Sequence, residues 1–127
     1  MVLASVCSFS GSAPAQTSQP AAPGNDPDGR PYDAQIYRLS EIFGAVHYLR
    51  ELCGAEEGQI WRDRMRDLVN AEGTSALRRA RLVDSFNKGY RGYARTYRSC
   101  TRPAVLAINR FMEQGASIAD ALIENHR

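Results

Sequence analysis

Apolar residues recur at steps of three and four along most of the chain after residue 31, a spacing that is typical of amphipathic helices. The first such segment covers residues 32–53. Its apolar positions are Ile36, Leu39, Ile42, Phe43, Val46, Leu49, Leu52 and Cys53. Gly54 follows at once, and glycine is common just after the last residue of a helix. We therefore predict a first helix over residues 32–53.

A second segment, over residues 56–71, has the same period and begins with two acidic residues. Glu56 and Glu57 suit a helix start because the helix dipole favours negative charge there. The apolar face consists of Trp61, Met65, Leu68 and Val69. Glu72 and Gly73 end the pattern, which predicts a second helix.

The third segment is the longest, and Thr74 or Ser75 can cap its N-terminus with a side-chain oxygen. Its expected inner face consists of Ala76, Ala80, Val83, Phe86, Tyr90, Tyr93, Tyr97 and Cys100. Gly89 and Gly92 each disfavour a helix by about 1 kcal/mol relative to alanine. The aromatic spacing nevertheless passes through both glycines without a change of phase, so we predict one continuous helix.

A fourth segment follows Thr101, which can cap a helix that has Pro103 in its first turn. The inward positions are Ala104, Ala107, Ile108, Phe111, Gly115, Ile118, Ala119 and Leu122. No stretch alternates polar and apolar residues in the manner of a half-buried strand. We therefore predict an all-α domain in which four helices, joined by short connections, form a roughly antiparallel, bundle-like arrangement.

The N-terminal region differs in composition from the helical part. Residues 1–15 begin with an apolar run, contain no charged side chain and end on Ala, Pro and Ala, whose small residues suit signal peptidase. We interpret them as a signal peptide whose basic start is missing from the sequence. Residues 16–31 are rich in Pro, Gly, Gln, Ser and Asp, which predicts a flexible linker before a single helical domain over residues 32–127. The alternative to a signal peptide at the N-terminus is a disordered tail rich in Ser, Ala and Pro.

Cleavage after residue 15 would leave two cysteines, Cys53 and Cys100, each at the expected C-terminal end of a helix and on its apolar face. An even number of cysteines in an exported chain predicts a disulfide. The alternative is a pair of buried free thiols in a cytosolic protein. The sequence has neither a Cys-x-x-Cys nor a Cys-x-x-Cys-His motif, which disfavours thiol redox catalysis and covalent haem attachment.

The net charge is only +2, but the charges are unevenly distributed. Residues 26–60 hold three basic and seven acidic residues, whereas residues 61–102 hold eleven basic and four acidic residues. Six of these basic residues recur at helical spacing on one face of the expected third helix: Arg81, Lys88, Arg91, Arg95, Arg98 and Arg102. Such a face predicts binding of phosphate or carboxylate groups, for which arginine is well suited. The alternative is a solvated face balanced by acids such as Glu41, Glu51 or Asp67.

A basic helix face would also fit nucleic acid, but export argues against that partner. The anions of a bacterial envelope are lipid head groups, lipopolysaccharide phosphates, cell-wall carboxylates and acidic proteins. No stretch is long and apolar enough to span a bilayer, which takes about 20 residues. We therefore expect a soluble or peripheral protein without a transmembrane segment, and the oligomeric state is left open.

Two other groups of residues have structural interpretations that we favour. His47 and Glu51 lie four residues apart on the first helix and could form an acid–base pair or provide two metal ligands. A zinc site would need at least three protein ligands, so this pair alone does not make one. Tyr90, Tyr93 and Tyr97 could form a sugar-binding platform, although their spacing follows the expected core face.

Trp61 begins the apolar face of the second helix, and we expect it to be a core anchor, with an exposed partner contact as the alternative. The sequence has no glycine-rich phosphate loop, no nucleophile elbow and no His-Glu-x-x-His motif. We therefore expect no catalytic residues, no metal ligands and no cofactor.

Five segments of the sequence are distinctive: Arg30–Asp33, His47–Cys53, Trp61–Arg62, Phe86–Gly92 and Thr96–Cys100. With these segments the chain resembles a family of small, uncharacterised proteins of alphaproteobacteria that are predicted to be exported. The resemblance covers about residues 30–125, and it implies an exported protein in which the two cysteines are paired. The family has no established activity, so the resemblance implies no catalytic residue and no cofactor.

These features favour a non-enzymatic function. We expect a protein of the periplasm or cell envelope that binds an anionic partner or envelope component through the basic helix face. The alternative is a cell-wall-related enzyme, or a regulator of such an enzyme, that uses a polar site near His47 and Glu51.

Overall fold

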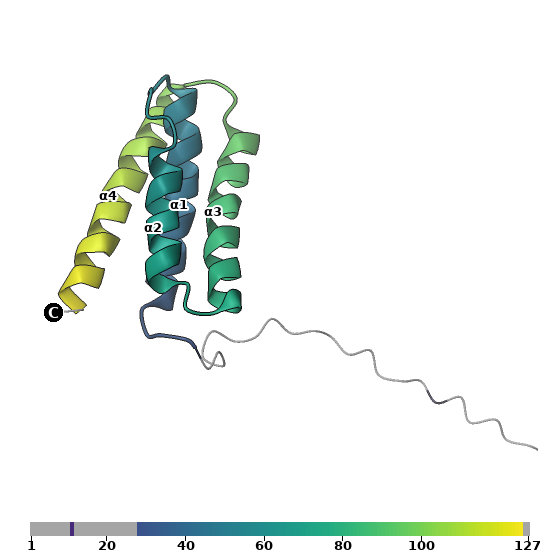
Figure 1. Ribbon diagram of the computed structural model, residues 1–127. Coiled ribbons are helices and arrows are strands. Elements are labelled where there is room, and N and C mark those ends of the chain that lie inside the picture. Colours follow the sequence, from purple (N-terminus) through teal and green to yellow (C-terminus); the bar gives the residue numbers. More distant parts are fainter. Residues whose placement is uncertain (1–10, 12–27, 126–127) are drawn as a thin grey trace, which may run out of the picture.

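The computed structural model describes residue 11 and residues 28–125, and the latter form four α-helices without a strand. The helices are α1 (Asp33–Leu52), α2 (Ile60–Glu72), α3 (Ala76–Thr96) and α4 (Arg102–Asn125) (Figure 1). This confirms the predicted all-α domain of four helices. The predicted signal peptide and the predicted linker up to residue 27 lie outside the described residues, apart from Gly11.

Helix α2 begins four residues later than predicted. Gly58 has a left-handed φ of +57°, which a continuing helix excludes, so the acidic pair before it lies in the connection. The helix starts expected from capping residues are confirmed. The amide of Arg78 donates to Ser75 Oγ at 3.2 Å, and the amide of Ala104 donates to Thr101 Oγ1 at 3.3 Å.

Helix α3 continues through Gly89 and Gly92, as predicted, but it ends four residues before Cys100. The residue after the helix, Tyr97, is extended, with φ −115° and ψ 118°. Its carbonyl oxygen accepts a hydrogen bond from the hydroxyl of Tyr48 on α1. The prediction that Cys100 belongs to the inner face of this helix was therefore wrong, because this contact directs the chain out of the helix.

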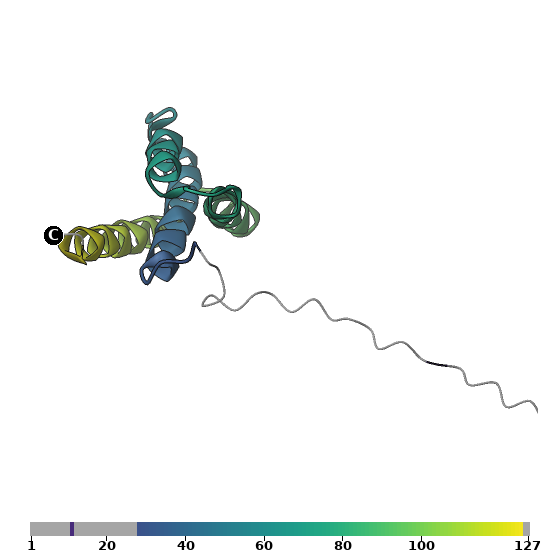
Figure 2. The same ribbon diagram turned by 60° about the horizontal axis from the view of Figure 1, so that its bottom comes forward.

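Helix α1 is the central element of the fold. Its backbone lies close to each of the other three helices, and α2 also lies close to α3. The backbone of α4 lies close to that of α1 alone among the described helices, while its side chain Phe111 also meets Tyr93 of α3. In the turned view, α2, α3 and α4 lie on three different sides of α1 (Figure 2). Helices adjacent in sequence run in opposite directions, as predicted, whereas α1 and α3 run in the same direction (Figure 1). Short connections between sequence neighbours produce this up-and-down order.

Helices α1 and α3 approach so closely that their backbones touch. A Cβ atom added at Gly44 would lie 2.0 Å from the carbonyl oxygen of Phe86, and one added at Gly89 would lie 2.0 Å from the carbonyl oxygen of Glu41. Both obstacles are backbone atoms of the facing helix, so no side-chain movement relieves the overlap. Gly89 therefore allows the close packing of α3 on α1. Gly92 has no such role, because an added Cβ there meets nothing within 4 Å.

The core has two parts that share α1. One lies between α1 and α4 and consists of Ile42, Ala45, Val46, Leu49, Ala104, Ala107, Ile108 and Phe111. The other lies among α1, α2 and α3 and consists of Ile36, Met65, Val69, Leu82 and Phe86. The inner faces predicted for α1, α2 and α4 supply most of these residues and are thereby largely confirmed.

The inner face predicted for the first half of α3 was wrong. Val83 is 43% exposed, and Ala76 and Ala80 are exposed as well, whereas Leu82 and Arg78 are fully buried. The helix is therefore turned about its axis relative to the prediction. The apolar pattern does not predict this orientation, because the charged residue Arg78 is among the residues that α3 buries.

Arg78 holds together the ends of three helices. Its Nη1 donates to the two carboxylate oxygens of Asp33 at 2.7 and 2.8 Å, and its Nε donates to the carbonyl oxygen of Glu72 at 2.9 Å. The Glu72 carboxylate lies 3.5 Å from Nη2. The carbonyl oxygen of Asp28 also accepts from Nη1, so residues 28–31, predicted as the end of the linker, are attached to the domain. Removing one partner of a buried ion pair typically costs about 3–5 kcal/mol.

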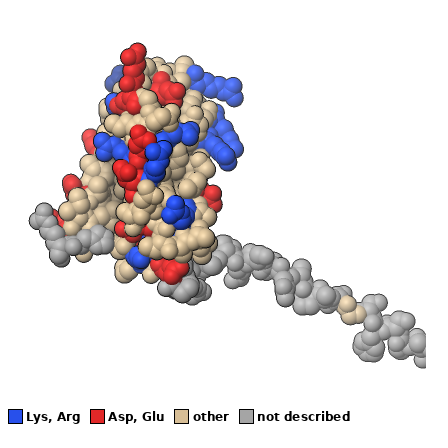
Figure 3. Space-filling model, in the orientation of Figure 1, with Lys and Arg blue, Asp and Glu red and all other residues tan. Residues whose placement is uncertain are grey.

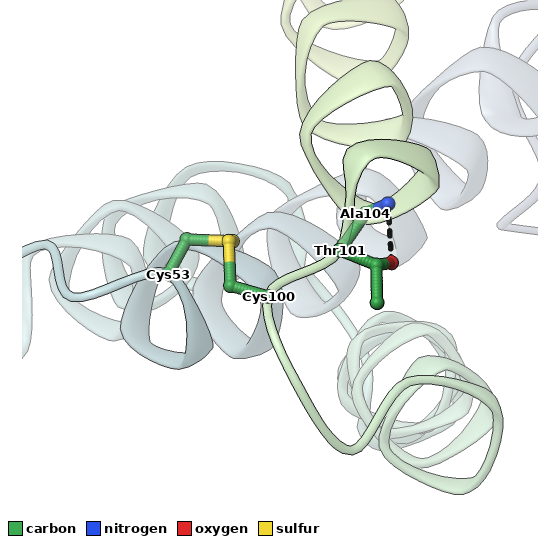
Figure 4. The surroundings of a disulfide bond; sticks show 4 residues. All are labelled: Cys53, Cys100, Thr101 and Ala104. Atoms are coloured by element: carbon green, nitrogen blue, oxygen red, sulfur yellow. Dashed lines mark hydrogen bonds between the residues drawn. A yellow bond between two sulfur atoms is a disulfide. The ribbon is translucent and has the colours of Figure 1, made fainter.

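A disulfide between Cys53 and Cys100 joins the end of α1 to the connection between α3 and α4 (Figure 4). The two Cα atoms are 4.9 Å apart, and 47 residues separate the cysteines in sequence. The predicted pairing is confirmed. Chain entropy gives about 4 kcal/mol of stabilisation for a closed loop of this length. The bridge also fixes the start of α4, because the capping residue Thr101 follows Cys100 directly (Figure 4).

We predict that Gly89→Ala lowers the free energy of unfolding by about 3 kcal/mol, near the upper end of the usual cost of overpacking. The added methyl group would meet the backbone of Glu41, and the two helices would have to separate along their contact. Urea unfolding followed by circular dichroism measures the change.

Gly92→Ala is the matched control, since it makes the same substitution three residues later on the same helix. It should raise the free energy of unfolding by about 1 kcal/mol, which is the helix preference of alanine over glycine. An unchanged or increased stability of the Gly89→Ala variant would contradict the backbone contact between α1 and α3.

Candidate functional site

The six basic residues predicted to share one helix face are divided between α3 and the segment after it. On α3 lie Arg81, Lys88, Arg91 and Arg95; Arg98 lies in the following connection, and Arg102 is the first residue of α4. All six are exposed except Arg81, which is half-buried. Lysine and arginine side chains project from the side of the molecule on which α3 lies (Figure 3). We call these six residues the basic face, and only its first four members form the predicted helical stripe.

The middle of the basic face is hollowed. A depression of about 410 Å³ is lined by Asp84, Asn87, Lys88, Arg91, Gly92 and Arg95. Because Gly92 has no side chain and no close neighbour, the backbone of α3 is open at this point. Three cations and one carboxylate line the depression and leave it net positive. The guanidinium, ammonium and amide groups can donate several hydrogen bonds to one phosphate or carboxylate group.

The exposed charges of the basic face are not balanced within the domain. In the described part of the chain, ion pairs join Arg38 to Glu41, Arg50 to Glu57, Arg66 to Asp63, and Arg78 to Asp33 and Glu72. None of these pairs involves the five exposed residues of the basic face. Of the three acids that could have balanced the face, Glu41 pairs with Arg38, and Glu51 and Asp67 form none of these pairs. None of these three acids therefore forms an ion pair with the exposed residues of the basic face in residues 28–125.

His47 lies at the edge of a second, smaller depression of about 150 Å³ between α1 and the start of α2. Its lining consists of His47, Glu51, Ala55, Glu57, Gly58, Gln59 and Trp61. His47 is only 4% exposed, and its ring centroid lies 6.2 Å from that of Phe86 and 5.8 Å from that of Tyr90. The Nε of Arg62 donates to His47 Nε2 at 3.2 Å. His47 and Glu51 thus share a depression, as the second function hypothesis requires.

The protonation state of His47 limits what this depression can do. Burial, and then the charge of Arg62, lower the pKa of His47, while Glu51 and Glu57 oppose this shift more weakly. The imidazole is therefore neutral near pH 7, and its Nε2 lone pair accepts from Arg62. That lone pair can bind a metal or take a proton from a substrate only if Arg62 moves. Among the residues that the structure describes, no three His, Cys, Asp or Glu side chains gather as a metal site.

Glu57 connects the opposite wall of this depression to α1. Its carboxylate accepts from Arg50 Nε at 2.7 Å and from Trp61 Nε1 at 2.6 Å, and the Arg50 bond is the main cause of a lowered pKa of Glu57. Trp61 is half-buried, with its ring centroid 6.1 Å from that of Phe43. Trp61 therefore anchors α2 on α1, which agrees with its interpretation as a core residue.

The tyrosines near the end of α3 pack toward the core. Tyr93 stacks on Tyr97 with centroids 6.1 Å apart and meets the edge of Phe111 at 5.0 Å. Tyr90 meets the edge of Tyr48 at 5.4 Å. All three tyrosines are half-buried, so core packing accounts for their spacing without a sugar-binding role.

Comparison with known proteins places the chain in a family. Residues 31–126 match the family described as protein of unknown function (DUF2385). The chain belongs to the DUF2385 family. No curated protein and no solved structure matches it. The family description assigns no activity to this DUF2385 protein. Within residues 28–125, none of its helices combines the length and apolar character that crossing a membrane requires.

We predict that the free energy of unfolding falls as the pH drops below about 6.5, the ordinary pKa of histidine. Because folding lowers the pKa of His47, the unfolded chain binds a proton in a pH range where the folded chain does not. The stabilisation is complete above pH 6.5 and is lost as the pH falls toward the lowered pKa. Urea unfolding at about pH 7.5 and about pH 5.5 measures this difference.

A His47→Gln variant serves as the control, because glutamine keeps a polar side chain of similar length without a titrating group. Its stability should change less over the same pH range than that of the wild type. Equal pH dependence in the two proteins would show that His47 is not held neutral by the fold.

Proposed function

We propose that this DUF2385 protein is a non-enzymatic protein of the periplasm or cell envelope that binds an anionic, phosphate-bearing envelope component through the basic face. The observation that carries this proposal is the set of five exposed cations without an ion-pair partner in residues 28–125, three of which line the depression over Gly92. Cations without an internal carboxylate keep their attraction for an incoming anion.

The lining of the depression favours a ligand that combines phosphate with hydroxyl groups. The planar guanidinium groups of Arg91 and Arg95 suit bidentate contacts with phosphate oxygens, and Lys88 adds a third cation. The carboxylate of Asp84 would accept hydrogen bonds from a hydroxyl group of the same ligand. The side-chain amide of Asn87 can donate to a phosphate oxygen or accept from a hydroxyl group. Phosphatidylglycerol head groups and the phosphorylated sugars of lipopolysaccharide have this composition.

The disulfide supports an envelope location. Disulfides persist mainly in oxidising compartments such as the bacterial periplasm, and they are rare in the cytosol. The bridge between Cys53 and Cys100 closes a loop of 47 residues, so the domain gains much of its stability from it. A location outside the cytosol would bring the basic face to the anions named above.

The second candidate function is a cell-wall-related enzyme, or a regulator of one, that uses the depression at His47 and Glu51. The observation in its favour is that the two side chains do line one cavity, together with the carboxylate of Glu57. Against it stands the hydrogen bond from Arg62, which occupies the His47 lone pair that a general base would need. We therefore place it second.

We predict that the double variant Arg91→Glu/Arg95→Glu binds vesicles containing phosphatidylglycerol about 30-fold more weakly than the wild type. Each basic residue near an anionic membrane surface contributes about 1 kcal/mol, so the loss of two accounts for this factor. Co-sedimentation with the vesicles measures the binding. Wild-type binding should also weaken as the salt concentration rises, because exposed charges are screened.

The matched control is Arg66→Glu/Arg79→Glu, which reverses two exposed arginines away from the depression and lowers the net charge by the same four units. This control should bind nearly as well as the wild type, and both double variants should keep the circular dichroism spectrum of the helices. Equal binding by the two double variants would mean that net charge, and not the basic face, attracts the vesicles, which would refute the proposal.

A further inference from the structure

Helix α4 leaves much of its surface apolar and uncovered. Seven large apolar side chains are exposed in the described part of the chain, and four of them lie on α4. They are Val105 (43% exposed), Leu106 (57%), Met112 (39%) and Ile123 (57%). The backbone of α4 lies close to that of α1 alone among the described helices, and Phe111 meets Tyr93 of α3 through side chains, so no described helix covers the face that carries these exposed residues. Grouped apolar side chains of this kind mark interaction surfaces.

Several of these positions form one line along the helix. Val105, Met112 and Ile123 are separated by intervals of 7 and 11 residues, both close to whole numbers of helical turns. Ala116 and Ala119 lie on the same line, and their small side chains allow a second helix to approach closely. We call these five residues the α4 stripe. Three of them, with residues of α1 and α2, line an apolar groove of about 280 Å³.

The charges of α4 indicate what would cover the α4 stripe. The first half of the helix carries Arg102 and Arg110, the second half carries Asp120 and Glu124, and Glu113 lies at the middle. A second α4 packed antiparallel would bring the basic half of each helix to the acidic half of the other. Arg102 would then lie beside Glu124 of the second copy. A parallel second helix would instead place like charges side by side, which is unfavourable.

The α4 stripe is also complementary to itself in the antiparallel arrangement. Val105 would face Ile123 of the second copy, and Met112 would face Ala116 of the second copy. Both pairs are centred on Gln114, so one two-fold axis satisfies both contacts. A symmetric dimer requires this kind of self-complementary surface, in which each contact occurs twice.

We propose that the α4 stripe is a homodimer interface in which the α4 helices of two copies pack antiparallel about an axis near Gln114. Each α4 gains a helix against its exposed apolar face and covers the open side of the apolar groove of the other copy. The interface is separate from the basic face, except that Arg102 belongs to both.

Sedimentation equilibrium of the full chain tests the interface. The wild type should form dimers, and Met112→Glu should raise the dissociation constant about tenfold or more, because a further acidic group would be buried near the axis beside Glu113. The matched control is Val83→Glu on α3, a position with similar exposure to Met112, and it should dimerise like the wild type. A monomeric wild type, or equally tight dimers of Met112→Glu, would overturn the proposal and indicate that a different protein covers this face.

Charge exchange tests the antiparallel direction. Arg102→Glu should weaken the dimer, because two acids would meet, and the exchange Arg102→Glu/Glu124→Arg should restore the wild-type dissociation constant. In a parallel dimer Arg102 would face Arg102 of the second copy, so Arg102→Glu would replace one like-charge pair by another and leave the dissociation constant unchanged. That result would refute the proposed packing. Glu113 lies near the axis and would face Glu113 of the second copy, so Glu113→Gln should lower the dissociation constant; a raised value would also refute it.

Discussion

The fold depends on the backbone contact between α1 and α3 at Gly44 and Gly89. With no side chain at either position, the carbonyl oxygens of one helix lie where a Cβ of the other would be. This contact sets the distance between the two helices, and α1 is fastened at both ends as well. Arg78 binds its first residue to the ends of α2 and α3, and the disulfide ties its last turn to the start of α4. Helix α1 is therefore enclosed by the other three helices, and its own surface is used for packing.

A central α1 leaves the outer faces of α3 and α4 for interactions. They lie on different sides of α1 and differ in chemistry, since the outer face of α3 is cationic and that of α4 is apolar (Figures 1 and 2). Anion binding and self-association can therefore occur in the same molecule. A dimer through α4 would carry two basic faces, and two sites on one particle bind an anionic surface more tightly than one site does. Arg102, which belongs to both surfaces, would couple the two events.

The sequence predicts the features that depend on local chemistry. Periodicity indicates four helices, hydroxyl caps mark two of their starts, and an even cysteine count indicates the disulfide. It does not predict the orientation of α3, because the buried Arg78 pairs with Asp33, which is 45 residues away in the sequence. Nor does it predict where α3 ends, which depends on a hydrogen bond from Tyr48. Spacing identifies the four members of the basic face on α3, but it does not predict that Arg98 and Arg102 lie beyond the end of this helix. The depression within the face depends on the absence of any neighbour around Gly92.

Amide hydrogen exchange in dilute solution tests most directly whether α1 and its contact with α3 form the centre of the fold. Amides around Gly44 and around Gly89 should exchange most slowly, at rates set by global unfolding, because these segments are the most enclosed. Amides in the second half of α4, which has a single packed face, should exchange faster. If the slowest amides instead lie in α4, or if those around Gly44 exchange as fast as those of α4, then α1 is not the element on which the structure depends.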